Sequence, residues 1–317
     1  MQKIETAVSS IKFVNHPESL YTPIEYVLSI GGKRVRPILS LVACNMYSEQ
    51  IEQAIKPALG IEVFHNFTLL HDDLMDEAEK RRNKPTVHKV WDANTAILSG
   101  DAMLIVAYQL ISETPSEYLK EVLDLFTFTA LEICGGQQYD MLFESRLDVT
   151  EEEYIEMIRM KTAVLLACSL KTGAILGGAS DNDATLLYNL GINMGLAFQL
   201  QDDLLDVYGD TEVFGKNIGG DILCNKKTFL LINALKFSDA GQREDIVKWI
   251  RKEQYSCQAK IDFFTTLYSN LGIREIAEEK IKYYHTEAMN CLSQLSVPEC
   301  RLQLLKDVCD SLMVREF

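Results

Sequence analysis

The sequence predicts an all-α protein. Apolar residues recur at spacings of three and four along almost the whole of its 317 residues, which is the period of an amphipathic helix. Alternating runs of β-branched residues, which are typical of strands, are almost absent. The apolar content of 47% is that of an ordinary globular protein, and no Ser/Gly-rich linker divides the chain. We therefore expect a single domain over residues 1–317.

The expected helices of the N-terminal half begin and end at recognisable signals. Gly31-Gly32 ends a helix that begins near Pro23, and Pro37 is well placed as the first residue of the next helix. A long helix then runs from about Ile55 to Glu79, and Asn83-Lys84-Pro85 makes a turn after it. Three further helices are expected at 5–14, from 98 to about 111, and at 117–143, the last with glycines at 135 and 136 that indicate a kink or a close approach.

In the C-terminal half, Thr150-Glu151-Glu152-Glu153 is a capping box, and the helix that it begins carries Lys161 within an apolar face. Because burying an unpaired ammonium group is costly, we expect an anion close to Lys161. Another helix is expected from Asp183 to Asp210, followed by a loop that ends near residue 228. The remainder, after Phe229, has the pattern of amphipathic helices.

Two acidic motifs of the same form lie on two of these helices. Asp72-Asp73-Leu74-Met75-Asp76 and Asp202-Asp203-Leu204-Leu205-Asp206 both follow apolar runs. A spacing of four residues places the first and last carboxylates on one helical face. If two such helices faced each other, their carboxylates would repel unless cations lay between them. Oxygen ligands without Cys or His pairs point to Mg²⁺, which is usually held by a few carboxylates and by substrate phosphates.

Basic residues recur close to the acidic motifs. The segment from Lys33 to Arg36 lies at a helix N-terminus, where backbone N–H groups and the helix dipole favour an anion. His65 shares a helical stripe with the first acidic motif, and Arg81-Arg82 follow that motif at once. Each group alone could equally be a solvated charge or a structural residue. Together, the basic residues at 33, 36, 81, 82, 161, 216 and 226 suit a diphosphate-bearing substrate, whose leaving group they would stabilise as its C–O bond breaks.

Composition and missing motifs exclude other classes. The net charge of −15 argues against a general nucleic-acid binder. The chain has no P-loop, no Rossmann glycine pattern and no nucleophile with a base beside it. Its eight cysteines lack C-x-x-C and zinc spacings, and with no signal peptide at the start we expect reduced thiols in a cytoplasmic protein. The longest unbroken apolar runs, such as 102–108, are too short to span a bilayer.

The motifs together resemble those of the trans-isoprenyl diphosphate synthases, the polyprenyl synthetases that include farnesyl and geranylgeranyl diphosphate synthases. The resemblance implies an isoprenoid synthase-type helical bundle around a deep central cavity, normally in a homodimer. It rests on five ordered motifs: Gly31-Gly32-Lys33-Arg34-Val35-Arg36-Pro37, the acidic motif at 72–76 with Arg81-Arg82, Lys161-Thr162, Phe198-Gln199, and the acidic motif at 202–206.

The resemblance also implies a reaction. An allylic diphosphate (dimethylallyl, geranyl or farnesyl) would ionise, and the double bond of isopentenyl diphosphate would attack its C1. A proton would then be lost to the released diphosphate, which leaves a trans-prenyl diphosphate of C15–C20. Three Mg²⁺ would be held on the allylic diphosphate by Asp72, Asp76 and Asp202, while Asp206 and the middle carboxylates would support them without binding the metal directly.

The same resemblance assigns the remaining site residues. One set would contact the allylic diphosphate: Arg81, Lys161, Gln199, Lys216 and Lys226. Thr162 is a further expected substrate-binding residue. A slip of one residue in the loop would put Lys227 in place of Lys226. A second set would bind isopentenyl diphosphate: Lys33, Arg36, His65 and Arg82.

Product length is the third implication. In this family a bulky residue five positions before the first Asp limits the chain, and that position holds Phe67, next to the small Thr68. This pattern, with no insertion in the acidic motif, resembles the short-chain enzymes. At about 100° per residue, however, Phe67 points roughly 140° round the helix from Asp72, so it could instead be an ordinary core residue.

The sequence leaves two other functions to weigh. A class I terpene cyclase shares the fold and the first acidic motif, but it needs no second diphosphate site, and its second metal motif normally carries Asn, Ser and Glu. A non-catalytic regulatory subunit of a prenyl diphosphate synthase should have lost acidic or basic ligands, and this chain keeps all of them.

Overall fold

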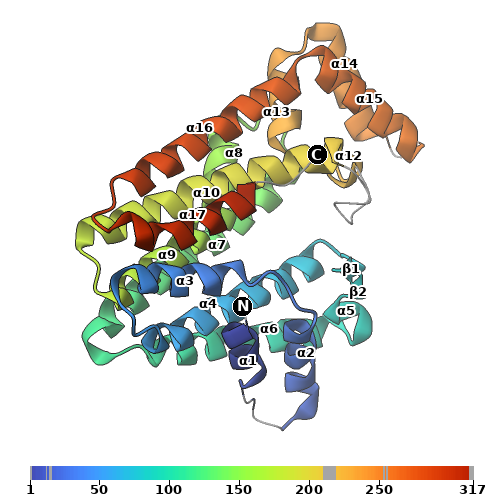
Figure 1. Cartoon of the computed structure of the whole chain (residues 1–317). Helices are drawn as coiled ribbons and strands as arrows, with labels where there is room; N and C mark the ends of the chain where they lie inside the picture. Colours follow the sequence, from blue (N-terminus) through green and yellow to red (C-terminus); the bar gives the residue numbers. More distant parts are fainter. Residues whose placement is uncertain are drawn as a thin grey trace. The chain divides into compact units, whose positions relative to one another are not determined.

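The computed structural model describes residues 2–11, 13, 16–209, 219–252, 254 and 256–313 (Figure 1). These residues are mostly helical, and the only strands among them form a short hairpin, which confirms the predicted all-α class. The elements, in order, are α1 (Gln2–Ser9), α2 (Glu18–Ser29), α3 (Val35–Tyr47), α4 (Glu52–Met75), β1 (Lys80–Arg81), β2 (Lys84–Pro85), α5 (Val87–Val90), α6 (Ala93–Ser112), α7 (Ser116–Glu144), α8 (Glu151–Ile158), the π-helix η1 (Arg159–Ala163), α9 (Val164–Gly177), α10 (Asp181–Tyr208), α12 (Gly220–Leu223), α13 (Phe229–Phe237), α14 (Ala240–Arg251), α15 (Cys257–Asn270), α16 (Ile273–Ser293) and α17 (Glu299–Met313).

The chain divides into two compact units that are interleaved in sequence. Unit 1 comprises Met1–Phe128, Cys168–Tyr188 and Ser296–Leu305. Unit 2 comprises Thr129–Ala167, Asn189–Leu295 and Lys306–Phe317. Because α7, α9, α10 and α17 contribute residues to both units, neither unit is a continuous segment. The single domain over residues 1–317 stays a prediction.

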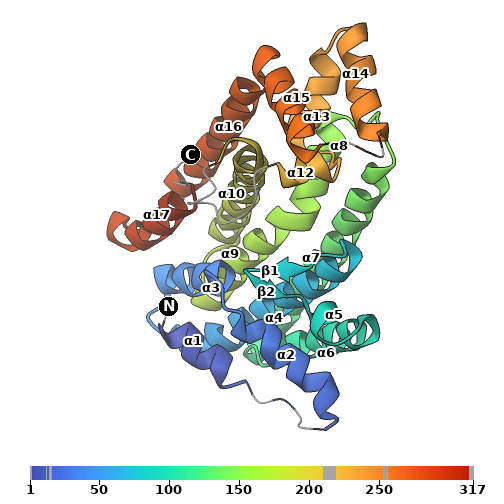
Figure 2. The same ribbon diagram turned by 90° about the vertical axis from the view of Figure 1, so that its right-hand side faces the viewer.

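Unit 1 is organised around α4. This helix packs against α3 and α6, and α2 packs against α6 (Figures 1 and 2). A Cβ at Gly60 would lie 2.9 Å from the Ala107 carbonyl oxygen, so glycine is what allows α4 and α6 to approach so closely. Ile61 on α4 and Met103 on α6 are completely buried. The apolar run that precedes the first acidic motif is therefore a core element of unit 1.

A β-hairpin follows α4, although the sequence predicted only a turn there. Lys80–Arg81 pairs with Lys84–Pro85 in antiparallel register. The loop residues Arg82 and Asn83 have φ angles of 50° and 62°, the left-handed pair of a type I′ hairpin turn. The predicted turn at 83–85 is thus displaced by one residue, and Arg82 lies at the tip of the hairpin.

Unit 2 contains a π-helical turn, η1, between α8 and α9. A Cβ at Gly136 of α7 would lie 2.5 Å from the Lys161 backbone nitrogen, and one at Gly195 of α10 would lie 2.5 Å from the Ala163 Cα. The close approach predicted at Gly135-Gly136 is therefore confirmed, since the backbone of η1 passes directly over Gly136. Single π-turns within helices occur frequently at functional sites.

The rest of unit 2 packs around α13. Phe229, Leu230 and Ala234 are almost completely buried, in a cluster that includes Phe264 of α15 and Ile273 of α16. The short α12 contacts α15, and α12 to α15 gather at one end of α16 (Figure 2). This arrangement fixes the chain segment that follows the second acidic motif.

Two predicted terminal signals are confirmed. Thr150 and Glu153 form the capping box at the start of α8, with Thr150 accepting from the Glu153 N–H. Gly31 directly follows Ile30, the C-cap residue of α2. Its φ of 85° is the left-handed conformation that commonly ends a helix.

Several predicted helix ends were wrong. α2 begins at Glu18 and includes Pro23, and α3 begins at Val35, so Pro37 is its third residue. Pro37 costs α3 no hydrogen bond, because the first four N–H groups of a helix have no partner within it. α4 ends at Met75 rather than Glu79, and α6 begins at 93 rather than 98 because Asp92 caps it by accepting from the Thr95 N–H. α1 ends at Ser9, whereas the predicted ends at 14 and 210 lie outside the described residues.

Within the described part of the chain, two helices are long and apolar enough to cross a membrane. They are Ala93–Ser112 and Glu151–Gly177, which continues through η1. Most of the second is buried in the protein, and core helices of soluble proteins meet the same two conditions. The apolar run at 102–108, which is too short to span a bilayer, is thus part of a longer apolar helix, α6. The eight cysteines are all free, as expected.

Candidate functional site

The first acidic motif lies at the C-terminal end of α4. Asp76 is the C-cap residue, and its N–H donates to the Asp72 carbonyl oxygen at 2.8 Å. The C-terminal end of a helix carries partial negative charge, so carboxylates placed there are unfavourable without a nearby cation. The position of the motif thus requires positive charge.

The hairpin supplies part of that charge. The Arg81 guanidinium donates through Nε to both oxygens of Asp73, at 2.9 and 2.8 Å, and its Nη2 lies 2.8 Å from Asp73 Oδ1. Asp73 is only 6% exposed, and burial raises its pKa although Arg81 opposes the shift. Arg81, predicted to contact the allylic diphosphate, is therefore bound to the middle carboxylate of the motif.

A second group of basic residues lies at the turn between α2 and α3. A Cβ at Gly32 would lie 2.6 Å from Arg82 Nη1, so the Arg82 guanidinium at the hairpin tip packs directly against this glycine. Arg36 Nε is buried, and it has no hydrogen-bond partner among the residues that the structure describes. Burial lowers the pKa of Arg36 to about 10, and the positive charge of Arg82 adds to this effect. The fold thus brings Arg36 and Arg82, which are far apart in the sequence, into one cationic cluster.

His65 belongs to this cluster. Burial and the positive charges of the surrounding arginines, first Arg36 and then Arg82, hold the pKa of His65 well below its usual range. The imidazole is therefore neutral near pH 7, and the cluster presents guanidinium charge beside a neutral hydrogen-bonding ring. Such a group would stabilise a bound anion. Lys33, the fourth predicted member, is exposed on the same turn.

Arg34 was not predicted as a site residue, yet it holds this turn in place. It is 3% exposed and donates to Glu62 Oε1 at 2.8 Å and to the Leu28 carbonyl oxygen at 2.8 Å. It also reaches Glu5 of α1 at 3.2 Å, and its φ of 49° is left-handed. Its place between Lys33 and Arg36 was the only sequence signal for this role, and that signal does not distinguish a buried arginine from an exposed one.

In unit 2, Lys161 lies on η1 and pairs with Asp140 of α7, with Nζ 2.5 Å from Oδ2. This carboxylate is the anion that was expected near Lys161. The neighbouring Thr162 hydroxyl donates to Gln199 Oε1 at 3.2 Å, and Gln199 Nε2 donates to Asp203 Oδ1 at 3.1 Å. Three of the predicted motifs of unit 2 are thus joined by hydrogen bonds.

Asp203 is the centre of this network. It is 3% exposed and accepts from the Tyr154 hydroxyl and from the Phe229 N–H, the latter at 3.3 Å. Burial, with the negative charge of Asp221, raises the pKa of Asp203 to about 7. Tyr154 was missed because an aromatic residue on an apolar helical face has the pattern of a core residue.

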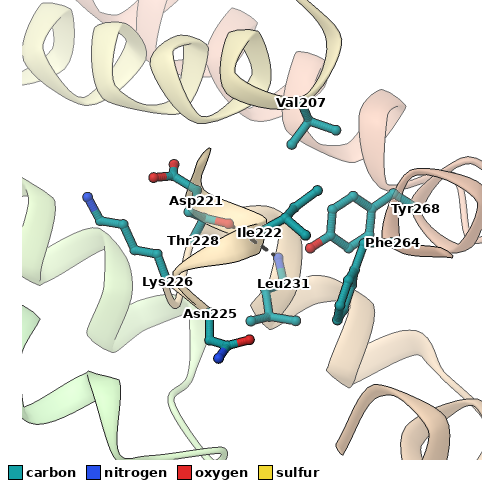
Figure 3. Close-up of a pocket in the computed structure, with 9 residues that line it drawn as sticks. All are labelled: Val207, Asp221, Ile222, Asn225, Lys226, Thr228, Leu231, Phe264 and Tyr268. Atoms are coloured by element: carbon teal, nitrogen blue, oxygen red, sulfur yellow. Dashed lines mark hydrogen bonds between the residues drawn. The ribbon is translucent and has the colours of Figure 1, made fainter. Parts of the chain in front are cut away.

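The segment after the second acidic motif folds back onto it. Asp206 accepts from the Asp221 N–H through Oδ2 at 3.0 Å and from the Gly219 N–H through its carbonyl oxygen at 2.6 Å. Figure 3 shows the side chains of Asp221 and Lys226 extending to the same side of this segment. Lys226 is exposed, whereas Lys227 is buried and donates to the carbonyl oxygens of Glu144 and Asn225. Lys216 lies outside the described residues.

The predicted site residues thus fall into two groups, one in each unit. Unit 1 holds Lys33, Arg36, His65, Phe67, Thr68, Asp72, Asp76, Arg81 and Arg82. Of these, Arg36, His65 and Arg82 lie in one cationic cluster. Unit 2 holds Lys161, Thr162, Gln199, Asp202 and Lys226. Within the described residues, no group of three or more His, Cys, Asp or Glu side chains is placed to hold a metal ion by itself.

Comparison with known proteins identifies the family. The profile of the polyprenyl synthetase family matches residues 17–267. The chain is 41% identical over 247 residues to a short chain isoprenyl diphosphate synthase of Methanothermobacter thermautotrophicus, covering 78% of this chain and 75% of that protein. It is 35% identical over 333 residues to a geranylfarnesyl diphosphate synthase of Natronomonas pharaonis, covering 99% and 95%. A crystal structure of a geranylgeranyl pyrophosphate synthase superposes with a TM-score of 0.92 at 40% identity, covering 100% and 96%.

An all-helical fold of this kind is that of the isoprenoid synthases. The chain belongs to the polyprenyl synthetase family, and it is a trans-prenyltransferase that elongates prenyl chains.

The low pKa of His65 generates a prediction about stability. In the unfolded chain a histidine titrates near 6.5, whereas folded His65 titrates well below this value. As the pH falls below 6.5, the unfolded state gains a proton that the folded state does not, so stability is lost on acidification. For one proton the slope of this loss approaches about 1.4 kcal/mol per pH unit between the unfolded and the folded pKa.

His65→Gln should remove this part of the pH dependence. Urea unfolding at pH 7, 6 and 5 measures it, and His16→Gln, at an exposed histidine, is the matched control. Equal pH dependence in the wild type and His65→Gln would show that His65 is not held neutral by its surroundings.

Proposed function

We propose that the protein condenses isopentenyl diphosphate with an allylic diphosphate in a Mg²⁺-dependent reaction and releases a C15–C20 trans-prenyl diphosphate. Family membership supports the reaction class. The relatives named short chain isoprenyl and geranylgeranyl diphosphate synthase support a product of up to C20, whereas the geranylfarnesyl diphosphate synthase is named for a C25 product. The allylic diphosphate leaves, the double bond of isopentenyl diphosphate attacks C1, and the proton lost from the new chain goes to the released diphosphate.

The cationic cluster of unit 1 is the observation that carries this proposal. Arg36 and Arg82 lie around a neutral His65, and Arg36 Nε is buried without a partner in the described part of the chain. Removing that donor from water is costly unless a ligand accepts its hydrogen bond. We assign the cluster, with Lys33, to the diphosphate of isopentenyl diphosphate. A terpene cyclase acts on one diphosphate and would have no use for this cluster.

The allylic diphosphate is assigned to the acidic motifs and the basic residues beside them. Asp72, Asp76 and Asp202 would hold three Mg²⁺, and when bound these ions supply the positive charge that stabilises the diphosphate leaving group. The donor set fits, because it consists entirely of carboxylate oxygens, the ligands that Mg²⁺ prefers in proteins. Mg²⁺ is usually held by one or two carboxylates with substrate phosphates, so a complete preformed centre is not required.

The protein's own residues would orient this substrate. Lys161, released from Asp140, and the exposed Lys226 would contact diphosphate oxygens, as would Lys216. The burial of Lys227 supports Lys226 for this role. Thr162 and Gln199 would hold Asp203 and thereby orient Asp202, which is next to it on α10. Arg81 would orient the first motif through Asp73 in the same way.

The metal assignment predicts a large loss of rate. Asp72→Asn or Asp202→Asn should lower kcat about 10³-fold, because each removes a ligand at the place where charge develops in the transition state. Asp310→Asn, at an exposed carboxylate of α17, should leave kcat unchanged. EDTA should abolish activity and added Mg²⁺ restore it, so full activity in EDTA would refute the proposed metal dependence.

The two diphosphate sites should respond separately to substitution. Arg36→Ala should raise the KM for isopentenyl diphosphate by about 10–100-fold, since a charged hydrogen bond contributes about 1.5–3 kcal/mol in both ground and transition states. Lys161→Ala should instead lower kcat and weaken the binding of the allylic substrate. Steady-state kinetics with each substrate varied in turn measures this, with the exposed Lys56→Ala as control. A change confined to the allylic KM in Arg36→Ala would contradict the assignment.

Phe67 is the proposed limit on product length. Its ring lies on α4 one turn before the acidic motif, in contact with the rings of Phe64 at 5.4 Å and His71 at 4.8 Å between centroids. It is only half-buried, in contrast to Phe64, which is 1% exposed. A ring that is packed on one side and open on the other suits a wall that stops a growing prenyl tail.

Phe67→Ala should shift the products to C25 or longer with little loss of kcat, because the tail gains room while the metal ligands are unchanged. Chromatography of the dephosphorylated products gives the length distribution. Phe237→Ala, at an exposed ring of α13, is the control. An unchanged distribution in Phe67→Ala would make Phe67 a core residue and leave the limit to another side chain.

The protein is further proposed to be a cytoplasmic homodimer without a membrane span. Large apolar side chains are exposed on α6, at Leu98 and Ile105, and on α7, at Phe128 and Leu131. Within each helix the two lie on one face, because they are seven and three residues apart. Exposed apolar side chains that share a helical face are stabilised when another surface covers them, and a second copy of the chain would cover them without requiring α6 to enter a bilayer.

Leu131→Asp should convert the dimer to a monomer, because a buried unpaired carboxylate is costly at an interface. Light scattering coupled to gel filtration measures the mass. Leu304→Asp, at an exposed leucine of α17, should leave the mass unchanged. A wild-type protein that runs as a monomer would refute the assignment of this surface.

A further inference from the structure

Two buried lysines without a role in the proposed reaction contact the segment 219–228: Lys227, which belongs to it, and Lys260 of α15. Lys260 of α15 is 0% exposed, and Lys227 is 4% exposed. Burial lowers the pKa of both ammonium groups. Because a buried ammonium group is tolerated only when its N–H groups are bonded, the contacts of these two lysines show what they hold.

Both lysines converge on Asn225. Lys260 Nζ donates to the Asn225 side chain at Oδ1, at 2.6 Å, and to the Leu223 carbonyl oxygen at 3.2 Å. Lys227 Nζ donates to the Asn225 backbone carbonyl oxygen at 3.0 Å, and also to that of Glu144 at 3.0 Å. The side chain and the backbone of one asparagine are thus fixed by two different buried cations.

Asn225 is the residue at which the chain reverses before Lys226. Its φ of 57° is left-handed, a conformation that asparagine adopts more readily than most residues. This turn allows the Lys226 N–H to donate to the Asp221 carbonyl oxygen at 2.9 Å. In Figure 3 the Asn225 side chain extends away from the side on which Asp221 and Lys226 lie. The conformation of Asn225 therefore sets the direction in which Lys226 leaves the backbone.

The other end of the segment is attached to the second acidic motif. The Asp221 N–H donates to Asp206 Oδ2 at 3.0 Å, and the Gly219 N–H donates to the Asp206 carbonyl oxygen. Asp206 holds the start of the segment, and Lys260 and Lys227 hold its end. The position of the Lys226 ammonium group relative to Asp202 then depends on both attachments, which lie within unit 2.

We propose that Lys260 is a positioning residue, which acts through Asn225 to hold Lys226 where it contacts the allylic diphosphate. The inference rests on the proposed function of Lys226. A neutral residue of the same length could fill the space of Lys260, but it would remove the hydrogen bonds that Lys260 Nζ donates to the Leu223 carbonyl oxygen and to Asn225 Oδ1. The turn would then relax, and a displacement of Lys226 by about 1 Å costs up to about 10²-fold in rate.

The test is a double-mutant cycle between Lys260→Met and Lys226→Ala. Lys260→Met alone should lower kcat about 10–100-fold, with the KM for isopentenyl diphosphate within about twofold of wild type. In the Lys226→Ala background, Lys260→Met should cost little more, since the group that it positions is already gone. Lys248→Met, at an exposed lysine of α14, should leave all constants unchanged.

Substitutions at Asn225 keep the test decisive if Lys260→Met does not fold. Asn225→Gly retains the left-handed turn and removes Oδ1, so it should lower kcat as Lys260→Met does. Asn225→Asp keeps an oxygen for Lys260 and should retain most of kcat. Unfolding midpoints of all variants ensure that each assay is run on folded protein.

The outcomes distinguish the role of Lys260 from the role assigned to Lys226. Wild-type kcat in folded Lys260→Met or in Asn225→Gly, or an equal loss with and without Lys226, would overturn the role of Lys260 and leave the proposed function intact. Wild-type kcat in Lys226→Ala would overturn the assignment of Lys226 itself, and with it this inference.

Discussion

The structure depends on how each acidic motif buries its middle carboxylate. Asp73 and Asp203 are almost completely buried, and each is fixed by donors from elsewhere in its own unit: Arg81 of the hairpin for Asp73, and Tyr154, Gln199 and the Phe229 N–H for Asp203. A buried carboxylate without donors would be severely destabilising, so these contacts are obligatory. They also orient the helical turn that carries the outer carboxylates.

The basic residues follow from close backbone packing. Arg82 reaches the turn between α2 and α3 because Gly32 leaves space for its guanidinium, and Lys161 reaches Asp140 because Gly136 allows η1 to pass directly over α7. Any larger residue at either glycine would displace a predicted substrate contact. The positions of these cations therefore depend on the glycines that leave space for them as well as on the contacts of the cations themselves.

Each unit also uses buried cations that do not belong to the predicted site. Arg34 holds the turn that carries Lys33 and Arg36, through Glu62 and Glu5, and the Lys260–Asn225–Lys227 contacts hold the turn that carries Lys226. In both cases a residue with left-handed φ lies next to an exposed lysine at the end of a helix. Arg34 is the N-cap of α3, and Asn225 directly follows the C-cap residue of α12. Flexible lysines gain a defined position when the backbone that carries them is rigid.

The sequence by itself determined the all-α class, the capping box at Thr150, the kink or close approach at Gly135-Gly136 and the need for an anion beside Lys161. These features depend on the period of the helix, on residues three or four apart, or on the cost of burying one charge. Only the tertiary structure decided that Arg81 binds Asp73, that Lys227 is buried while Lys226 is exposed, and that Tyr154 and Arg34 support the site. These pairings join residues whose neighbours in sequence look alike, and packing between distant elements selects among them.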